Sequence, residues 1–248
     1  MLVVRMEVDM SREARGALRL KTTSGSHQSI LFRRKSTTAS TPTNGSVLFQ
    51  NVFIGTLINL IHSATITPPS LGGDTARYFS IGSSLGGGAA VGVALKLIDE
   101  NLGQMCSGIV VLCPALLHPE FVPDEYKTLF KAYEENWTGS PLQDGESMMI
   151  FYGHNGGTNQ RANPYAFPCI HPGIFRLPPV YQAICEADPV RDDSTVLKYQ
   201  LDKFGVRNWF HTYPGMPHYF WLFPQLKSSE TFHQNVVEGV KWVLSQTN

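Results

Sequence analysis

Apolar and polar positions change their spacing repeatedly from Thr75 onward, as expected when strands and helices alternate along a parallel sheet. Runs of apolar and β-branched residues predict buried strands at 77–81, 107–112, 180–185 and 208–213. Apolar residues at helical spacing predict helices at Leu85 to about Asp99, about Ser194 to Phe204, and Ser229 to Leu244. The pattern therefore predicts an α/β fold with a mostly parallel sheet and flanking helices.

The second and third of these strands are separated by about 65 residues, whereas connections in such domains usually take about 2–6 residues. Two helical patterns, Asp124 to Asn136 and Gly145 to Tyr152, lie within this connection. We interpret it as a helical cap inserted over a pocket, covering about residues 117–170.

The beginning of the chain has a different pattern. Leu18–Lys21 and Ile30–Arg33 could form two strands joined by the turn-prone residues 24–26, and a Ser/Thr/Pro-rich linker follows at 36–46. We therefore divide the chain into a divergent segment, 1–46, and a main domain, 47–248.

Composition excludes several classes of protein. Twenty basic and twenty acidic side chains leave no net charge to attract nucleic acid. The longest apolar stretch, Val47–Ile61, is interrupted by polar residues and is shorter than the roughly 20 residues that span a bilayer. The four cysteines have neither C-x-x-C spacing nor the density of a disulfide framework. We expect no nucleic-acid partner, no membrane span, and reduced thiols in a cytoplasmic protein.

One glycine-rich segment carries candidate chemistry. Residues Gly82–Gly86 fit the pattern G-x-S-x-G between a predicted strand and a predicted helix. Such a turn must be tight to expose the Ser84 hydroxyl, and glycines at 82 and 86–88 remove Cβ atoms that would clash there. A glycine turn that binds phosphate or only packs closely is the alternative. However, no Lys-Ser/Thr pair follows, and the spacing is not G-x-G-x-x-G.

A nucleophilic serine needs a histidine base and a carboxylate that orients this base, and on such a sheet they follow in the order Ser, Asp or Glu, His. Asp188 follows the third predicted strand and His218 follows the fourth. Taken singly, an Asp-Pro after a strand is commonly a turn, and a loop histidine is commonly solvated. Because order and placement fit together, we predict a catalytic triad of Ser84, Asp188 and His218.

Other candidates are weaker. Residues His154–Gly157 are similar to an oxyanion-hole H-G-G motif but lie inside the predicted cap, where a helix-ending turn is the simpler interpretation. The remaining histidines lack metal-ligand spacing and no H-E-x-x-H occurs, so neither a metal nor another cofactor is predicted. Core packing and contact with substrate are both open for the candidate substrate-binding residues, which are Ser83, Met148, Tyr219 and Phe220.

The chain from about Leu71 to its end resembles the hormone-sensitive-lipase-like branch of the α/β-hydrolases. The resemblance rests on three segments in order: Gly82–Gly87 (the family writes G-D-S-A-G-G), Asp188–Asp192 (D-P-L-R-D) and His218–Phe220 (H-x-F). It implies an α/β-hydrolase fold with a helical cap in residues 47–248.

The resemblance also implies roles. Ser84 would be the nucleophile, and His218 the general base and then acid. Asp188 would fix the imidazole tautomer, and Leu85 would donate its backbone N–H to the oxyanion.

Within the predicted cap, Asp144–Met148 and Phe151–Gly153 resemble fungal members of the family that act in polyketide and toxin pathways, of the versiconal hemiacetal acetate esterase type. The resemblance implies a serine carboxylesterase that hydrolyses a small to medium ester through an acyl-enzyme. Its partner would be a small-molecule ester.

The sequence departs from the family upstream of Ser84, because the H-G-G-G segment that completes the oxyanion hole has no counterpart. Val47–Gly55 is the nearest analogue; alternatively, Asn51–His62 is the helix before the nucleophile strand and the segment is absent. The N-terminal strands of the sheet would then be reduced. Two alternatives follow: a catalytically impaired protein that binds its ligand, or a truncated or altered version of a longer enzyme.

Overall fold

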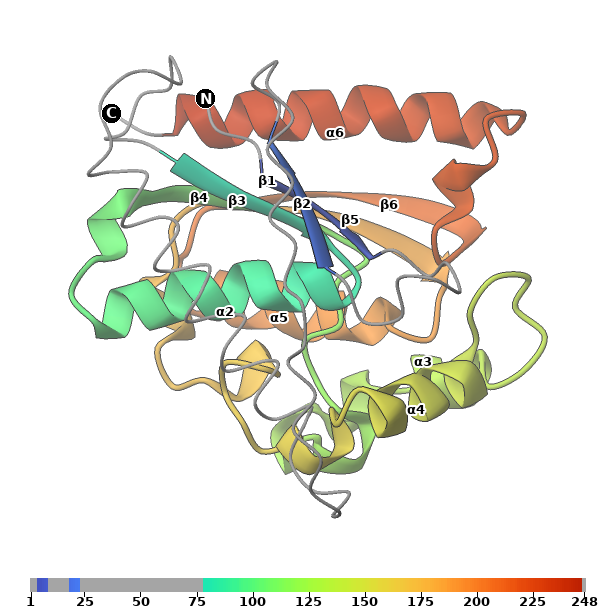
Figure 1. Ribbon diagram of the computed structural model, residues 1–248. Coiled ribbons are helices and arrows are strands. Elements are labelled where there is room, and N and C mark those ends of the chain that lie inside the picture. The colour runs from blue at the N-terminus through green and yellow to red at the C-terminus, as the bar shows by residue number, and fades with distance from the viewer. Residues whose placement is uncertain (1–3, 9–17, 23–77, 247–248) are drawn as a thin grey trace, which may run out of the picture.

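The computed structural model describes residues 4–8, 18–22 and 78–246 (Figure 1). Four parallel strands form the main sheet in the order β3-β4-β5-β6, and β1 and β2 pair separately. The strands are β1 Val4–Val8, β2 Leu18–Thr22, β3 Tyr78–Ser83, β4 Cys106–Leu112, β5 Val180–Ala187 and β6 Asn208–Pro217. The α-helices are α2 Leu85–Asp99, α3 Ala132–Glu135, α4 Gly145–His154, α5 Arg191–Lys203 and α6 Lys227–Ser245.

Each of the four apolar runs forms one strand of the parallel sheet, so the predicted α/β class is confirmed. β5 and β6 extend beyond their predicted ends, to Ala187 and Pro217, and Asp188 and His218 therefore come directly after their strands. The three predicted helices form α2, α5 and α6, although α5 begins three residues earlier than predicted, at Arg191.

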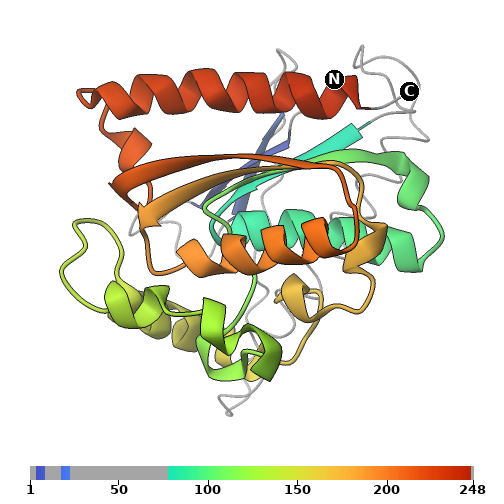
Figure 2. The same cartoon turned by 180° about the vertical axis from the view of Figure 1, so that it is seen from behind.

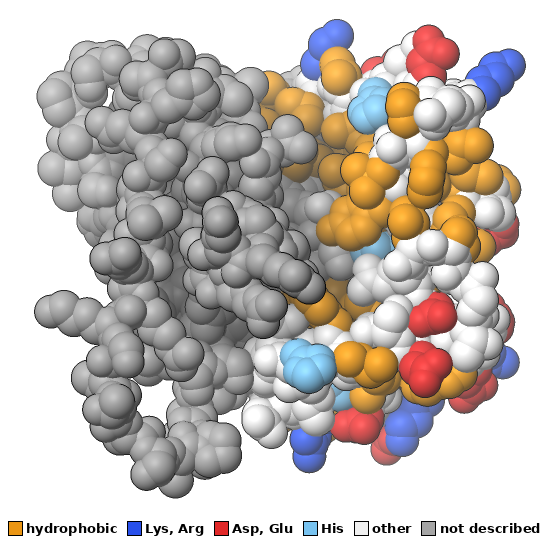
Figure 3. Space-filling view, turned by 45° about the vertical axis from the view of Figure 1, so that its right-hand side comes forward, with side chains coloured by type: hydrophobic (Ala, Val, Ile, Leu, Met, Phe, Trp, Pro, Cys, Tyr) orange, Lys and Arg blue, Asp and Glu red, His pale blue; other side chains and the backbone are white. Residues whose placement is uncertain are grey.

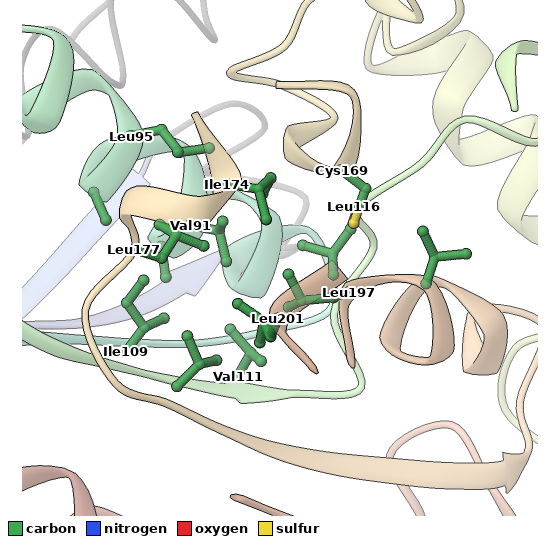
Figure 4. Packing of buried hydrophobic residues seen from close by; sticks show 14 of the residues in the cluster. Val91, Leu95, Ile109, Val111, Leu116, Cys169, Ile174, Leu177, Leu197 and Leu201 are labelled. Atoms are coloured by element: carbon green, nitrogen blue, oxygen red, sulfur yellow. The ribbon is translucent and has the colours of Figure 1, made fainter. Parts of the chain in front are cut away.

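The sheet is the middle of three layers, with α6 on one face and α2 and α5 on the other (Figures 1 and 2). Successive side chains of β4 alternate between these layers: Ile109 and Val111 pack with α2 and α5, whereas Val110 packs with α6. Buried Leu95 and Leu197 belong to the same cluster as Ile109 and Val111 (Figure 4). Burial on both faces explains why β4 and β5 are continuous apolar runs in the sequence. β6, predicted as a buried strand, is instead mostly half-buried or exposed.

Residues 113–179 connect β4 to β5 and contain α3, α4 and several short 3-10 turns. The helix predicted at Gly145 to Tyr152 is confirmed as α4. It begins at a capping box, in which the side chains of Asp144 and Ser147 accept hydrogen bonds from each other's backbone N–H. The proposed cap boundaries at 117 and 170 remain predictions.

The single helix predicted from Asp124 to Asn136 is wrong. Asp124–Leu129 forms a 3-10 helix, and only Ala132–Glu135 is α-helical. The cause is tertiary, because the Asp192 carboxylate on α5 accepts hydrogen bonds from the backbone N–H groups of Lys131 and Ala132, at 2.7 and 2.6 Å. These bonds fix the start of α3.

The N-terminal segment is described only in part. β2 matches the predicted strand Leu18–Lys21, and its partner is β1, in antiparallel register. The predicted strand Ile30–Arg33, the linker at 36–46 and the candidate segments within 47–62 lie outside the described residues. No helix in the described part of the chain is long and apolar enough to cross a membrane.

Candidate active site

The carboxyl ends of the four parallel strands meet at one edge of the sheet, where α/β proteins commonly bind their ligands. Each strand is followed at once by a chemically distinctive residue: Ser84 after β3, Cys113 after β4, Asp188 after β5 and His218 after β6. All four side chains are buried. The three residues predicted as a triad thus come from three different strand ends of one sheet edge.

Ser84 occupies a strained turn between β3 and α2. Its backbone has φ 53° and ψ −127°, a conformation that costs a residue with a side chain about 1–3 kcal/mol. Hydrogen bonds on both sides hold the turn: Ser84 N–H donates to Leu112 O at 3.0 Å, and Ser84 O accepts from Gly87 and Ala115 N–H. The neighbouring strand therefore fixes the position of this serine.

The glycines around Ser84 permit this turn. A Cβ atom at Gly82 would lie 2.0 Å from Gly86 O, and one at Gly87 or Gly88 would lie 2.7 Å from Pro114 Cβ or 2.3 Å from Ala115 O. At these three positions a Cβ atom would clash, as the sequence predicts. At Gly86, in contrast, no atom of the described residues lies within 4 Å of the added Cβ, so these residues give no steric reason for a glycine there.

Asp188 and His218 form a fully buried pair. The Nδ1 atom of His218 lies 2.7 Å from Oδ2 of Asp188, and both side chains have 0% exposure. The other carboxylate oxygen accepts a hydrogen bond from Val190 N–H at 2.9 Å. With the carboxylate at Nδ1, the stable neutral tautomer carries its proton on Nδ1. The arrangement leaves Nε2 of His218 as a proton acceptor.

The Nε2 atom of His218 lies 4.0 Å from the Cys113 thiol. Cys113 has a left-handed backbone with φ 39°, and burial, followed by the Cys185 thiol and the Asp188 charge, raises its pKa well above the usual value. No direct hydrogen bond joins Ser84 to His218 among the described residues. Such bonds are often long in free enzymes and tighten only around substrate.

Tyr219 links the serine turn to the histidine loop. Its hydroxyl lies 3.3 Å from Ser83 Oγ, and its ring meets the His218 ring edge-on at 4.4 Å between centroids. Burial raises the pKa of the Tyr219 phenol, while hydrogen bonds from the Ser83 and Ser84 hydroxyls act in the opposite direction. Tyr219 and Ser83, both predicted to contact substrate, therefore lie beside Ser84.

The other predicted site residues have different surroundings. Leu85 is the first residue of α2, where the backbone N–H has no partner within the helix, and its side chain packs against the cluster that contains buried Met148. Phe220 instead lies fully buried in the cluster beneath α6, where its ring packs against those of Tyr213 and Phe232. These core contacts do not support substrate binding by Phe220.

Two further features of the site were not found from the sequence. The Asp193 carboxylate accepts hydrogen bonds from the backbone N–H groups of Leu116 and Leu117, at 2.6 and 2.7 Å, and burial raises its pKa well above the usual value. It thus fixes the chain just after β4. The position of Cys113 beside His218 was also missed, because a cysteine after an apolar strand reads as an ordinary core residue.

The predicted H-G-G-like motif is a helix end. His154 is the last residue of α4, Asn155 caps it, and Gly156 has φ 71°. Among the described residues, one group of possible metal ligands comes together, namely Cys113, Cys185 and Asp188.

Comparison with known proteins shows to which family the chain belongs. A family model described as the alpha/beta hydrolase fold matches residues 55–222. The chain belongs to the α/β-hydrolase fold family. The match includes the serine turn, Asp188 and His218, and the predicted α/β-hydrolase fold is therefore confirmed.

This α/β hydrolase is 41% identical over 185 residues to a versiconal hemiacetal acetate esterase of Dothistroma septosporum. The aligned region covers 74% of this chain and 56% of the relative. The chain is 34% identical over 166 residues to a versiconal hemiacetal acetate esterase of Aspergillus parasiticus, covering 66% and 52%. The predicted resemblance to this esterase type is confirmed. The chain spans about half the length of these curated relatives.

Solved structures agree on the fold of this α/β hydrolase. Vibralactone cyclase superposes with a TM-score of 0.69 and 26% identity, covering 88% of this chain and 61% of that one. Brefeldin A esterase, described as a bacterial homologue of human hormone-sensitive lipase, superposes with a TM-score of 0.65 and 18% identity, covering 78% and 54%. At that identity, the second likeness concerns the fold alone.

Proposed function

We propose that this α/β hydrolase is a serine carboxylesterase that hydrolyses a small to medium ester. The observation that carries the proposal is the buried His218–Asp188 pair, 2.7 Å apart, at the same sheet edge as the strained Ser84 turn. A glycine turn that only packs would not need a histidine and a carboxylate from two further strands. Convergent groups of this kind are typical of catalytic sites.

In the proposed reaction, Ser84 Oγ attacks the ester carbonyl while Nε2 of His218 takes the hydroxyl proton. His218 then gives this proton to the departing alcohol, leaving an acyl-enzyme. Water attacks the acyl-enzyme, again with His218 as base, and the acid and the free serine result. Asp188 stabilises the charged imidazole through the Nδ1 bond throughout.

The developing oxyanion is proposed to bind at the N-terminus of α2. The backbone N–H of Leu85 points from the first helical position, next to Ser84, and the helix dipole favours negative charge there. The absence of an H-G-G-G sequence favours a second candidate function, that of an impaired hydrolase that binds a ligand.

The surroundings of Ser84 support an organic ester as substrate. Leu85 contacts a buried cluster that includes Met148 and Tyr152, and exposed apolar side chains such as Leu222 and Phe223 follow the His218 loop. Figure 3 shows apolar side chains gathered on the described face of the molecule. Together with the similarity to versiconal hemiacetal acetate esterases, this favours an acetyl or other short acyl ester of fungal polyketide metabolism.

The proposed setting is the cytoplasm. No disulfide joins Cys113 and Cys185 among the described residues, although both are buried and their sulfur atoms lie near each other. Neighbouring free thiols persist in a reducing compartment.

The function is tested with p-nitrophenyl acetate and butyrate. We expect hydrolysis by the wild type and a loss of about 10⁴-fold or more in kcat for Ser84→Ala, because the nucleophile is removed. Ser245→Ala, at the exposed end of α6, is the matched control and should retain wild-type activity. Hydrolysis that survives in Ser84→Ala would refute the proposal.

A further inference from the structure

Two buried thiols lie beside the Asp188 carboxylate of the proposed triad. One ligand atom each from Cys113, Cys185 and Asp188 lie within 4.8 Å of one another, and all three residues are buried. Nε2 of His218 is 4.0 Å from the Cys113 sulfur, so a fourth donor borders the group. Thiolate sulfur, imidazole nitrogen and carboxylate oxygen are all ligands that Zn²⁺ takes in proteins, and thiolate sulfur is the ligand that soft cations prefer.

The fold brings these side chains together. Cys113 N–H donates to Ala183 O at 2.8 Å, which continues the β4–β5 pairing one residue beyond the end of β4. Cys185 follows Ala183 by two residues, so its side chain points to the same face of the sheet as that of Ala183. Both cysteines belong to the cluster beneath α6, whereas Cys106 and Cys169 belong to the cluster on the opposite face. Among the described residues, Cys113 and Cys185 are the thiols that come together with a carboxylate.

The dimensions suit a zinc-like ion. Three atoms that all lie within 4.8 Å of one another leave a position within about 2.8 Å of each of them, whereas Zn–S bonds measure about 2.3 Å. Shifts of about half an ångström per ligand would complete the coordination. Two thiolates balance the charge of a divalent cation, and the carboxylate adds one further negative charge to the site.

We propose that Cys113, Cys185 and Asp188 form a site for one soft divalent cation, such as Zn²⁺ or Cd²⁺, and that the bound ion stops catalysis. Binding releases the two thiol protons to solvent and forms two metal–sulfur bonds, with no change of oxidation state. Ligation draws the Asp188 carboxylate toward the metal and thereby weakens its bond to Nδ1 of His218. The inhibitory half of the proposal rests on the proposed esterase function, while the binding half does not.

The proposed ion site adjoins the proposed reacting atoms. Any substrate that reacts with Ser84 has to come close to Nε2 of His218, and the Cys113 sulfur lies 4.0 Å from this atom. A bound ion would therefore lie next to the reaction that it is proposed to stop.

The binding test uses Cd²⁺ with the intact, reduced protein and follows the ultraviolet charge-transfer band of cadmium thiolates. We expect one Cd²⁺ per chain, competition by Zn²⁺, and affinity weakened by about tenfold or more in both Cys113→Ser and Cys185→Ser. Cys169→Ser is the matched control, since Cys169 is equally buried but lies on the other face of the sheet. Circular dichroism of each variant shows whether it is folded.

The band and its dependence on both cysteines decide the proposal. No band in the folded wild type, or a band weakened equally in Cys169→Ser, would overturn it. If esterase activity is present, Zn²⁺ should inhibit it reversibly, with recovery on adding a chelator; full activity with the site occupied would overturn the inhibitory half. Cadmium binding by a protein that hydrolyses no ester would instead refute the proposed function and leave the metal site standing.

Discussion

Ser84 illustrates how one residue carries both strain and chemistry. Its φ of 53° and ψ of −127° are held by bonds to Leu112 and Ala115, which belong to the neighbouring strand and the loop after it. A residue in this conformation persists only when its surroundings impose it. The packing of the sheet therefore offsets the cost of the strained turn. The turn in return lifts the serine side chain away from its strand.

The role of Asp188 gives a prediction at the same scale. Asp188→Asn preserves the size of the side chain, but its amide cannot favour the tautomer that leaves Nε2 of His218 as the base. We expect kcat for p-nitrophenyl butyrate to fall by about 10⁴-fold, with a much smaller change in KM. Asp202→Asn, which alters an exposed carboxylate on α5, is the control in steady-state kinetics. A loss below about tenfold in Asp188→Asn would show that this carboxylate does not orient the base.

The three proposed triad residues were predictable from the sequence because each follows a recognisable strand and their order is distinctive. Their distances were not, since they depend on the register of β4, β5 and β6. Cys113 was missed for a physical reason: a buried thiol and a small apolar side chain look alike in a sequence. For Phe220 the sequence left core packing and substrate contact open, and the structure places it in the core.

At the scale of elements, hydrophobic periodicity predicted the strands and the long helices well, because these elements are buried along a whole face or stripe. It failed between Asp124 and Asn136, where Asp192, about 60 residues away in the sequence, provides the hydrogen bonds that set the start of α3. Long-range backbone capping leaves no periodic signal. α5 therefore organises the connection between β4 and β5 through its buried carboxylates.

This role of α5 is testable. Asp192→Asn weakens the charged acceptor of Lys131 and Ala132 N–H and the pair with Arg191, so we expect a loss of about 1–3 kcal/mol in unfolding free energy. Limited proteolysis should then cut first within residues 113–179. Asp202→Asn, whose Lys198 pair is more exposed, should cost less than about 1 kcal/mol in the same urea titration. Equal losses in the two variants would contradict the proposed anchoring.

At the scale of the whole molecule, the family match and the described structure overlap without coinciding. The match covers residues 55–222, so it begins upstream of β3 and ends before α6, although α6 lies along one face of the sheet (Figure 2). The predicted departure from the family falls in the part before residue 78, which the structure describes only at β1 and β2. Sequence order and sheet topology therefore predict the residues of the proposed triad, all of which lie from Ser84 onward.

The central claim is that Ser84 is a nucleophile activated by His218, and covalent labelling tests it most directly. A fluorophosphonate probe reacts with a serine whose base and oxyanion donor are in place, whatever ester the enzyme prefers. We predict one phosphonate per folded chain by intact mass, located on Ser84 by peptide mapping, and no label on Ser84→Ala or on the heat-unfolded wild type. A folded wild type that stays unlabelled, or carries its label on another residue, would contradict the account and favour the impaired, ligand-binding alternative.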